Sequence, residues 1–215
     1  MTKKDTEKTV KAQPVQSKVM QGRVSAISDE ELPIIWINDI DMDIAQEFIK
    51  KLLQFESDPE VSEIYVYISS YGGEVFAGLA MIEAMNACSK PVNTVGIGIC
   101  ASAGADLVIC GTGTRWMSEN SFIHIHHTRN RVTDDLPGID RAIKQMRQVE
   151  ERIFKMIISK SKMTLNDMKL KLKDEEKEWQ VSSANAIKFG FVDILGMPKF
   201  KKYIVVENDT TKKPE

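Results

Sequence analysis

The segment Cys100-Ala101-Ser102-Ala103-Gly104-Ala105 places a hydroxyl group between the end of an apolar run and a helical pattern of small residues. A serine at a helix N-terminus lies where free N–H groups and the helix dipole favour negative charge. Ser102 could simply cap the helix, or it could be a nucleophile with the Ala103 N–H facing a developing oxyanion. The segment is not a G-x-S-x-G elbow, because Cys100 occupies the first glycine position.

All three histidines of the chain, His124, His126 and His127, lie in one apolar segment over residues 122–127. Strand alternation predicts His124 and His126 on one face and His127 on the other. No carboxylate or further histidine follows at ligand spacing, so no metal site is expected. The pattern favours a general base for Ser102, which in turn needs an acidic group to orient its ring.

A third segment, Ser69-Ser70-Tyr71-Gly72-Gly73, follows an apolar run and precedes a helical pattern. Paired glycines in this position are most simply a tight turn. The alternative is a backbone surface that a substrate carbonyl can approach closely, with an amide N–H facing it.

Apolar runs and helical patterns alternate through the first half of the chain, which predicts parallel βαβ units with buried strands. A helix capped by Asp41 or Asp43 is expected to bury Ile44, Phe48, Leu52 and Phe55. The expected strands are 32–37, 64–68, 92–99, 115–117 and 122–126, and the expected helices between them carry Val75 to Met85 and Ser102 to Cys110.

The second half is dominated by a helical stripe of Ile139, Ile143, Met146, Val149, Ile153 and Ile157. It predicts one helix from Pro137 to Ser159, about 30 Å long, which is more than a small sheet can cover. We expect its outer part to be buried between subunits. A shorter helix should follow Thr164, the charged run 169–178 should be a solvated helix face with its exit loop, and a last helix should run from the Ser182 cap to Gly190.

The composition is that of a globular protein: 215 residues, 42% hydrophobic, with a formal net charge of -2. The balance of charges gives no reason to expect a nucleic-acid or membrane partner. Three cysteines without pairing spacing indicate a reducing, cytoplasmic setting. We predict a flexible N-terminal arm over residues 1–30, one folded domain over 31–200 and a polar C-terminal tail over 201–215. There is no G-x-x-x-x-G-K-[ST] phosphate loop.

Four ordered segments resemble those of the Clp-type serine peptidases, over about residues 31–195. Residues 67–78 (YISSYGGEVFAG) resemble Y-I-N-S-P-G-G-x-V-x-x-G, and residues 101–105 (ASAGA) resemble the A-S-M-G-A nucleophile turn. Residues 120–127 (NSFIHIHH) are similar to N-S-x-x-M-I-H-Q, and residues 182–193 (SSANAIKFGFVD) to S-A-x-E-A-x-x-Y-G-L-V-D. The resemblance implies an α/β fold of the ClpP/crotonase type, with a parallel βαβ head and a long projecting handle helix.

Carried over by position, the resemblance implies Ser102 as nucleophile, His126 as base and the backbone N–H groups of Gly73 and Ala103 as the oxyanion hole. The third member falls on Glu178, where the family has an aspartate, and Asp174 is the rival. Tyr71 replaces the usual proline, and residues 128–137 lack the family's glycine-rich strand.

The implied function is a serine endopeptidase, the proteolytic subunit of an ATP-dependent, self-compartmentalising protease that hydrolyses unfolded polypeptides. The resemblance implies two stacked rings of seven identical subunits, fed by a ring ATPase unfoldase of the Clp type, with no cofactor and no metal. The alternatives are a phage head-maturation protease of the same fold, a catalytically silent ring subunit, and a crotonase-like acyl-CoA hydratase.

Overall fold

The computed structural model describes residues 32–129, 131–174 and 178–200; the predicted arm, the first residue of the predicted domain and the predicted tail lie outside these ranges. The core is a sheet of largely parallel strands in the order β1-β2-β3-β4-β7, with β5 paired to β3 and β6 paired to β5. The strands are β1 (Ile34–Ile37), β2 (Ile64–Ser70), β3 (Val92–Ala101), β4 (Arg115–Met117), β5 (Phe122–His126), β6 (Glu178–Ser182) and β7 (Ile194–Leu195). The predicted βαβ alternation is confirmed.

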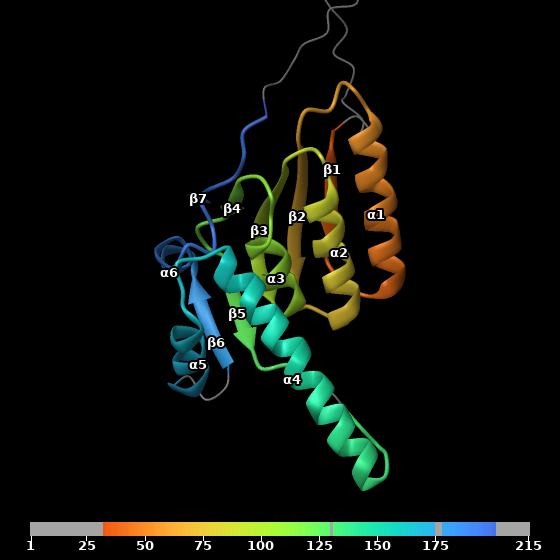
Figure 1. The fold of residues 1–215 in the computed structure, drawn as a ribbon. Helices are drawn as coiled ribbons and strands as arrows, with labels where there is room; N and C mark the ends of the chain where they lie inside the picture. The colour runs from red at the N-terminus through yellow and green to blue at the C-terminus, as the bar shows by residue number, and fades with distance from the viewer. Residues whose placement is uncertain (1–31, 130, 175–177, 201–215) are drawn as a thin grey trace, which may run out of the picture. The chain divides into compact units, whose positions relative to one another are not determined.

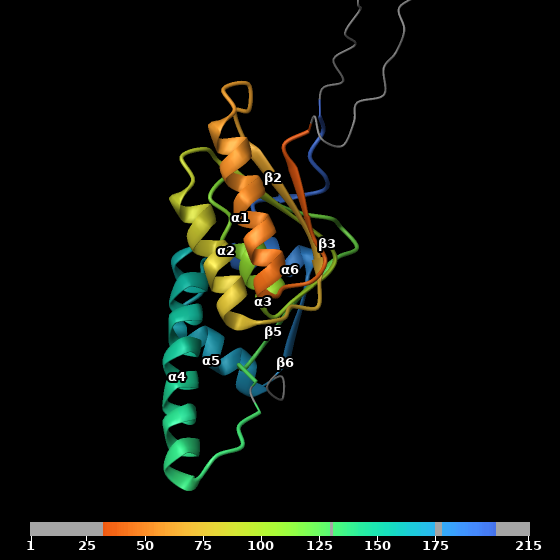
Figure 2. The ribbon, with the colours of Figure 1, turned by 90° about the vertical axis from the view of Figure 1, so that its right-hand side faces the viewer.

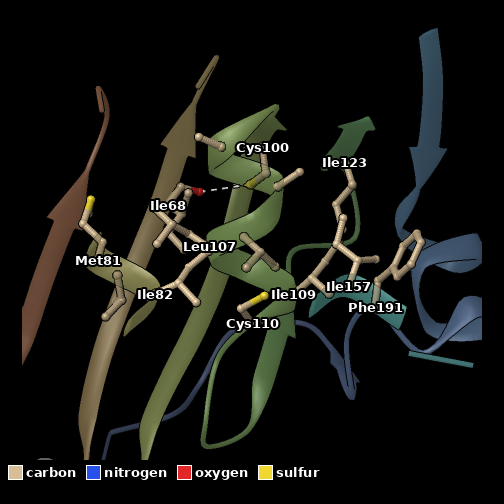
Figure 3. Packing of buried hydrophobic residues seen from close by; sticks show 14 of the residues in the cluster. Ile68, Met81, Ile82, Cys100, Leu107, Ile109, Cys110, Ile123, Ile157 and Phe191 are labelled. Carbon is tan, nitrogen blue, oxygen red and sulfur yellow. Dashed lines mark hydrogen bonds between the residues drawn. The ribbon is translucent and has the colours of Figure 1, made fainter. Parts of the chain in front are cut away.

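The helices α1 (Met42–Ser57), α2 (Val75–Ala87) and α3 (Ala103–Ile109) lie on one face of this sheet (Figures 1 and 2). Asp41 is the cap of α1, and its side chain accepts a hydrogen bond from Ile44 N at 2.8 Å. Phe48 and Leu52 of the predicted stripe are buried, whereas Ile44 and Phe55 are only half-buried. The α2 and α3 helices carry Met81, Ile82, Leu107 and Ile109 into the core between helix and sheet (Figure 3).

Strand β3 changes partner along its length, and this change creates the edge where the candidate site lies. Residues 94–96 pair with β4, and residues 99–101 pair with β5. Gly98 lies between the two sets at φ 62°, and its N–H donates to Ser121 Oγ at 2.7 Å. The end of β3 therefore runs beside β5, which brings the segment before Ser102 next to the histidine-bearing strand.

The long helix α4 (Leu136–Ser159) begins one residue before Pro137, with Asp135 as its cap. Its N-terminal half extends past the sheet in both ribbon views (Figures 1 and 2). Its C-terminal half packs into the fold, because Ile153 is only 9% exposed and Ile157 is fully buried. The expected stripe between subunits is thus shorter than predicted: Ile143, 46% exposed, belongs to it, whereas Ile153 and Ile157 are core residues of the chain itself.

The interpretation of the charged run 169–178 is confirmed for its helix and wrong for its exit loop. Helix α5 (Leu165–Asp174) exposes Lys169 and Lys173 as predicted, while its opposite face buries Met168 and Leu172 in the core. Glu178 does not lie in an exit loop but begins β6, which pairs antiparallel with β5. After β6, helix α6 (Ser183–Phe189) ends at Gly190 in the left-handed conformation, as the Ser182 and Gly190 signals predicted.

Candidate active site

Ser102 lies in a sharp turn between β3 and α3, and its backbone is strained. Its φ of 54° and ψ of -127° make it the one non-glycine residue with positive φ in the described ranges. Such a conformation costs about 1–3 kcal/mol and persists only where the surroundings impose it. The Ser102 N–H donates to the carbonyl oxygen of His124 at 2.9 Å, and the Ser102 carbonyl accepts from Ala105 and Asp106. Both sides of the turn are therefore held by hydrogen bonds.

The glycine turn after β2 packs directly against the Ser102 turn. A methyl group on Gly72 would lie 2.6 Å from Ser102 Cβ and 2.8 Å from the carbonyl oxygen of Ala101, so only glycine fits there. Gly72 also adopts a φ of 97°, which favours glycine on conformational grounds. The close approach places Gly73 and the start of α3, at Ala103, on the wall of one cavity.

That cavity, of about 140 Å³, brings together four of the five sequence-predicted site residues and does not include Glu178. Gly73, Ser102, Ala103 and His126 all line it. Its remaining wall is mostly apolar and comes from α2, β5 and α4; it includes Leu79, Ile82, Ile125, Ile153, Phe154 and Ile157. No hydrogen bond joins Ser102 Oγ to the His126 ring in the described structure.

The His126 ring is oriented by the backbone. Its Nδ1 lies 2.7 Å from the carbonyl oxygen of His127. With the proton on Nδ1 this contact is a hydrogen bond donated to the carbonyl, and Nε2 keeps the lone pair that a general base uses. Glu150 of α4 holds the segment that supplies this carbonyl, because its Oε1 is 2.9 Å from His127 Nδ1 and accepts from Thr128 N at 3.0 Å.

Glu178 is directly opposite His126 in the antiparallel ladder of β5 and β6. Opposed residues of such a pair project from the same face, with Cβ atoms about 5 Å apart. The Glu178 carboxylate is 3.6 Å from His124 Nε2 and contacts the Arg129 guanidinium. The predicted shared face of His124 and His126 is confirmed, with ring centroids 6.0 Å apart. Asp174 ends α5, and its side chain lies outside the described part of the structure.

The cysteine that precedes the serine turn is not reactive. Cys100 is buried, and its Sγ lies 3.2 Å from the carbonyl oxygen of Ile68, to which the thiol donates (Figure 3). Burial raises the pKa of Cys100 to about 12, so the thiolate does not form near neutral pH. Of the two residues, Ser102 and not Cys100 is therefore the candidate nucleophile of this segment.

One cavity residue escaped the sequence interpretation. Asp106 lies one helical turn after Ser102 on α3 and lines the same cavity. The spacing of four residues was the available signal, because residues i and i+4 share a face of a helix.

Among the described residues no cluster of three or more potential metal ligands occurs. No helix in the described ranges is long and apolar enough to cross a membrane.

Comparison with known proteins shows which sequences this chain is similar to. The family model of the Clp protease matches residues 17–198. The chain is 29% identical over 163 residues to the ATP-dependent Clp protease proteolytic subunit of Streptococcus mutans, covering 74% of this chain and 82% of that protein. For the same-named protein of Streptococcus uberis the identity is 27% over 165 residues, covering 75% and 83%. For ATP-dependent Clp protease proteolytic subunit 2 of Tropheryma whipplei it is 28% over 162 residues, covering 74% and 88%.

Proposed function

The chain belongs to the Clp protease family, and from this premise we propose how its residues divide the work of peptide hydrolysis. The family membership confirms the expected α/β fold of the ClpP type and the serine peptidase activity of a proteolytic subunit. It also favours this function over the hydratase alternative. The observation that carries the assignment of roles is the single cavity lined by Gly73, Ser102, Ala103 and His126.

In the proposed mechanism, Ser102 Oγ attacks the scissile carbonyl and His126 Nε2 accepts its proton. The negative oxygen then forms at the start of α3, where the Ala103 N–H and the Gly73 N–H donate to it. The first N–H groups of a helix have no partner within the helix, so Ala103 needs no rearrangement to donate. The peptide C–N bond then breaks as the protonated His126 gives its proton to the leaving amine, and an acyl group stays on Ser102 Oγ. Water hydrolyses this acyl-enzyme with His126 again as base, and the proton returns to Ser102 Oγ.

Glu178 is the proposed third member of the triad. Its position opposite His126 in the ladder supports this role, because a change of side-chain rotamer can move its carboxylate along the face that His124 and His126 share. Its carboxylate contacts His124 and Arg129 beside the site. The His127 carbonyl supplies a second acceptor for His126 Nδ1.

The proposed assembly is two stacked rings of seven identical subunits that receive unfolded polypeptide from a Clp-type ATPase. The exposed outer half of α4 supports an interface between subunits, since Leu136 is 80% and Ile143 is 46% exposed. The cytoplasmic location and the domain limits at residues 30 and 200 stay predictions.

The test is the substitution Ser102→Ala, assayed with short fluorogenic peptides, which need no unfolding, and with a fluorophosphonate label, which reacts with an activated serine. We expect peptide hydrolysis and labelling to fall to background while the particle keeps its size. The exposed Ser57, at the end of α1, provides the control variant Ser57→Ala, which should keep both signals. Hydrolysis by Ser102→Ala at the wild-type rate would refute the proposed nucleophile.

A further inference from the structure

Asp106 stands out because it places a carboxylate in an otherwise largely apolar wall beside the nucleophile. Its N–H donates to the Ser102 carbonyl at 3.1 Å, so the two residues are fixed relative to each other by one turn of α3. Asp106 lines the same cavity as Ser102, Ala103 and His126, which is the space that a bound substrate would occupy.

The Asp106 carboxylate accepts no hydrogen bond from, and forms no ion pair with, a described residue. Its oxygens are open to the cavity rather than sealed in the core, since the described structure has no buried side-chain oxygen without a partner. The other titratable groups around it are His126 and Arg129 on the cavity wall and Cys110 on its own helix. Arg129 contacts Glu178, and burial raises the pKa of Asp106 to about 7.

The cavity wall that includes Asp106 is where the substrate's P1 side chain must lie. A carbonyl carbon at Ser102 Oγ, with its oxygen on the Gly73 and Ala103 amides, occupies one part of the cavity. The P1 side chain leaves from the next carbon, so it enters the remaining space between α2, α3 and α4. Leu79, Ile82, Ile153 and Ile157 surround that space, and Asp106 is the acidic residue of its wall.

We propose that Asp106 determines specificity and selects peptides with lysine or arginine at P1. This inference rests on the proposed function, since it assumes that Ser102 is acylated. A basic side chain fits both parts of the wall: its aliphatic stem packs on the leucine and isoleucines, and its charge meets the carboxylate. A purely apolar side chain would displace the water from Asp106 and leave it without a partner, which is costly.

The experiment compares two fluorogenic peptides that differ only at P1, lysine in one and norleucine in the other, with the assembled wild-type enzyme at pH 8. Norleucine has the lysine stem without the ammonium group, so the ratio of kcat/KM isolates the charge. We expect lysine to be preferred by about tenfold or more. A ratio at or below one would overturn the proposal.

The variant Asp106→Asn should lower the ratio of kcat/KM for lysine over norleucine by about tenfold, and mainly by slowing the lysine peptide. The variant Glu83→Gln, which removes an exposed carboxylate from α2, should keep the wild-type ratio. If Asp106→Asn does not fold, the wild-type ratio alone decides.

The two hypotheses fail differently. Hydrolysis of the norleucine peptide with no preference for lysine would reject the role of Asp106 and leave the peptidase intact. Absence of hydrolysis of both peptides together with absence of fluorophosphonate labelling would reject the proposed function and this inference with it.

Discussion

The cost of keeping Asp106 without a partner should be visible in the stability of the enzyme without substrate. The pKa of Asp106 rises from its ordinary value of 3.8 to about 7 because burial disfavours the charged form. Between these two values the folded chain holds a proton that the unfolded chain has lost. Stability therefore decreases as the pH rises from about 4 to about 7, and the loss is complete above the folded pKa.

The size of the effect follows from the same values. At about 1.4 kcal/mol per pH unit, raising the pKa from 3.8 to about 7 costs the folded state at most about 4 kcal/mol. Asp106 is half-buried and open to the cavity, so water reduces this cost. We expect the wild type to lose about 1–2 kcal/mol more free energy of unfolding than Asp106→Asn between pH 5 and pH 8.

The measurement is urea unfolding followed by tryptophan fluorescence at both pH values, with equal protein concentrations because subunit association adds to stability. Comparing the pH dependence, rather than the absolute stability, removes any fixed effect of the asparagine amide. All other titratable groups are the same in both proteins, so their contributions to the pH dependence largely cancel. Glu83→Gln is the control for loss of one negative charge and should follow the wild type. Parallel profiles for wild type and Asp106→Asn would refute the reasoning.

Two further predictions concern the triad and the assembly. Glu178→Gln should reduce kcat by at least about tenfold, because a neutral amide no longer stabilises the His126 imidazolium. Fluorophosphonate labelling should become slower but not disappear. An unchanged kcat would show that the His127 carbonyl alone orients the ring. Ile143→Asp should split the particle in sedimentation velocity while the single subunit stays folded, because Ile143 is exposed in the subunit and a carboxylate in an apolar interface is costly. Ile153→Asp should instead unfold the subunit, since Ile153 is buried within the chain. If the Ile143→Asp particle keeps its full size, the proposed interface is contradicted.

The features that the sequence predicted well are those set by neighbouring residues. Asp41 caps α1, and Gly190 ends α6 in the left-handed conformation, because capping depends on a few consecutive positions. Ser182 stands at the predicted start of α6, although its side chain makes no capping hydrogen bond. The shared face of His124 and His126 follows from strand alternation alone. The turn at Ser102 was predicted from its small neighbours Ala101, Ala103 and Gly104 alone, whereas the packing of Gly72 against it is a contact across thirty residues.

The features that the sequence did not predict depend on distant contacts. β6 has only five residues and follows a charged run, and it becomes a strand by pairing with β5 more than fifty residues earlier. Its pairing decides that Glu178 faces His126 from a strand rather than from a loop. Asp106 is similar, because its spacing from Ser102 was visible, but the apolar wall around it comes from α2 and α4.

Helix α4 contributes both to the wall of the cavity and to the surface proposed to contact other subunits. Its inner half supplies Ile153, Phe154 and Ile157 to the wall of the cavity, and Glu150 fixes the segment whose carbonyl orients His126. Its outer half is the exposed surface proposed to contact other subunits. Because one continuous helix carries both, a shift of α4 in the proposed assembly would move the cavity wall and the support of His126 together. Glu150 would then couple the proposed assembly to catalysis.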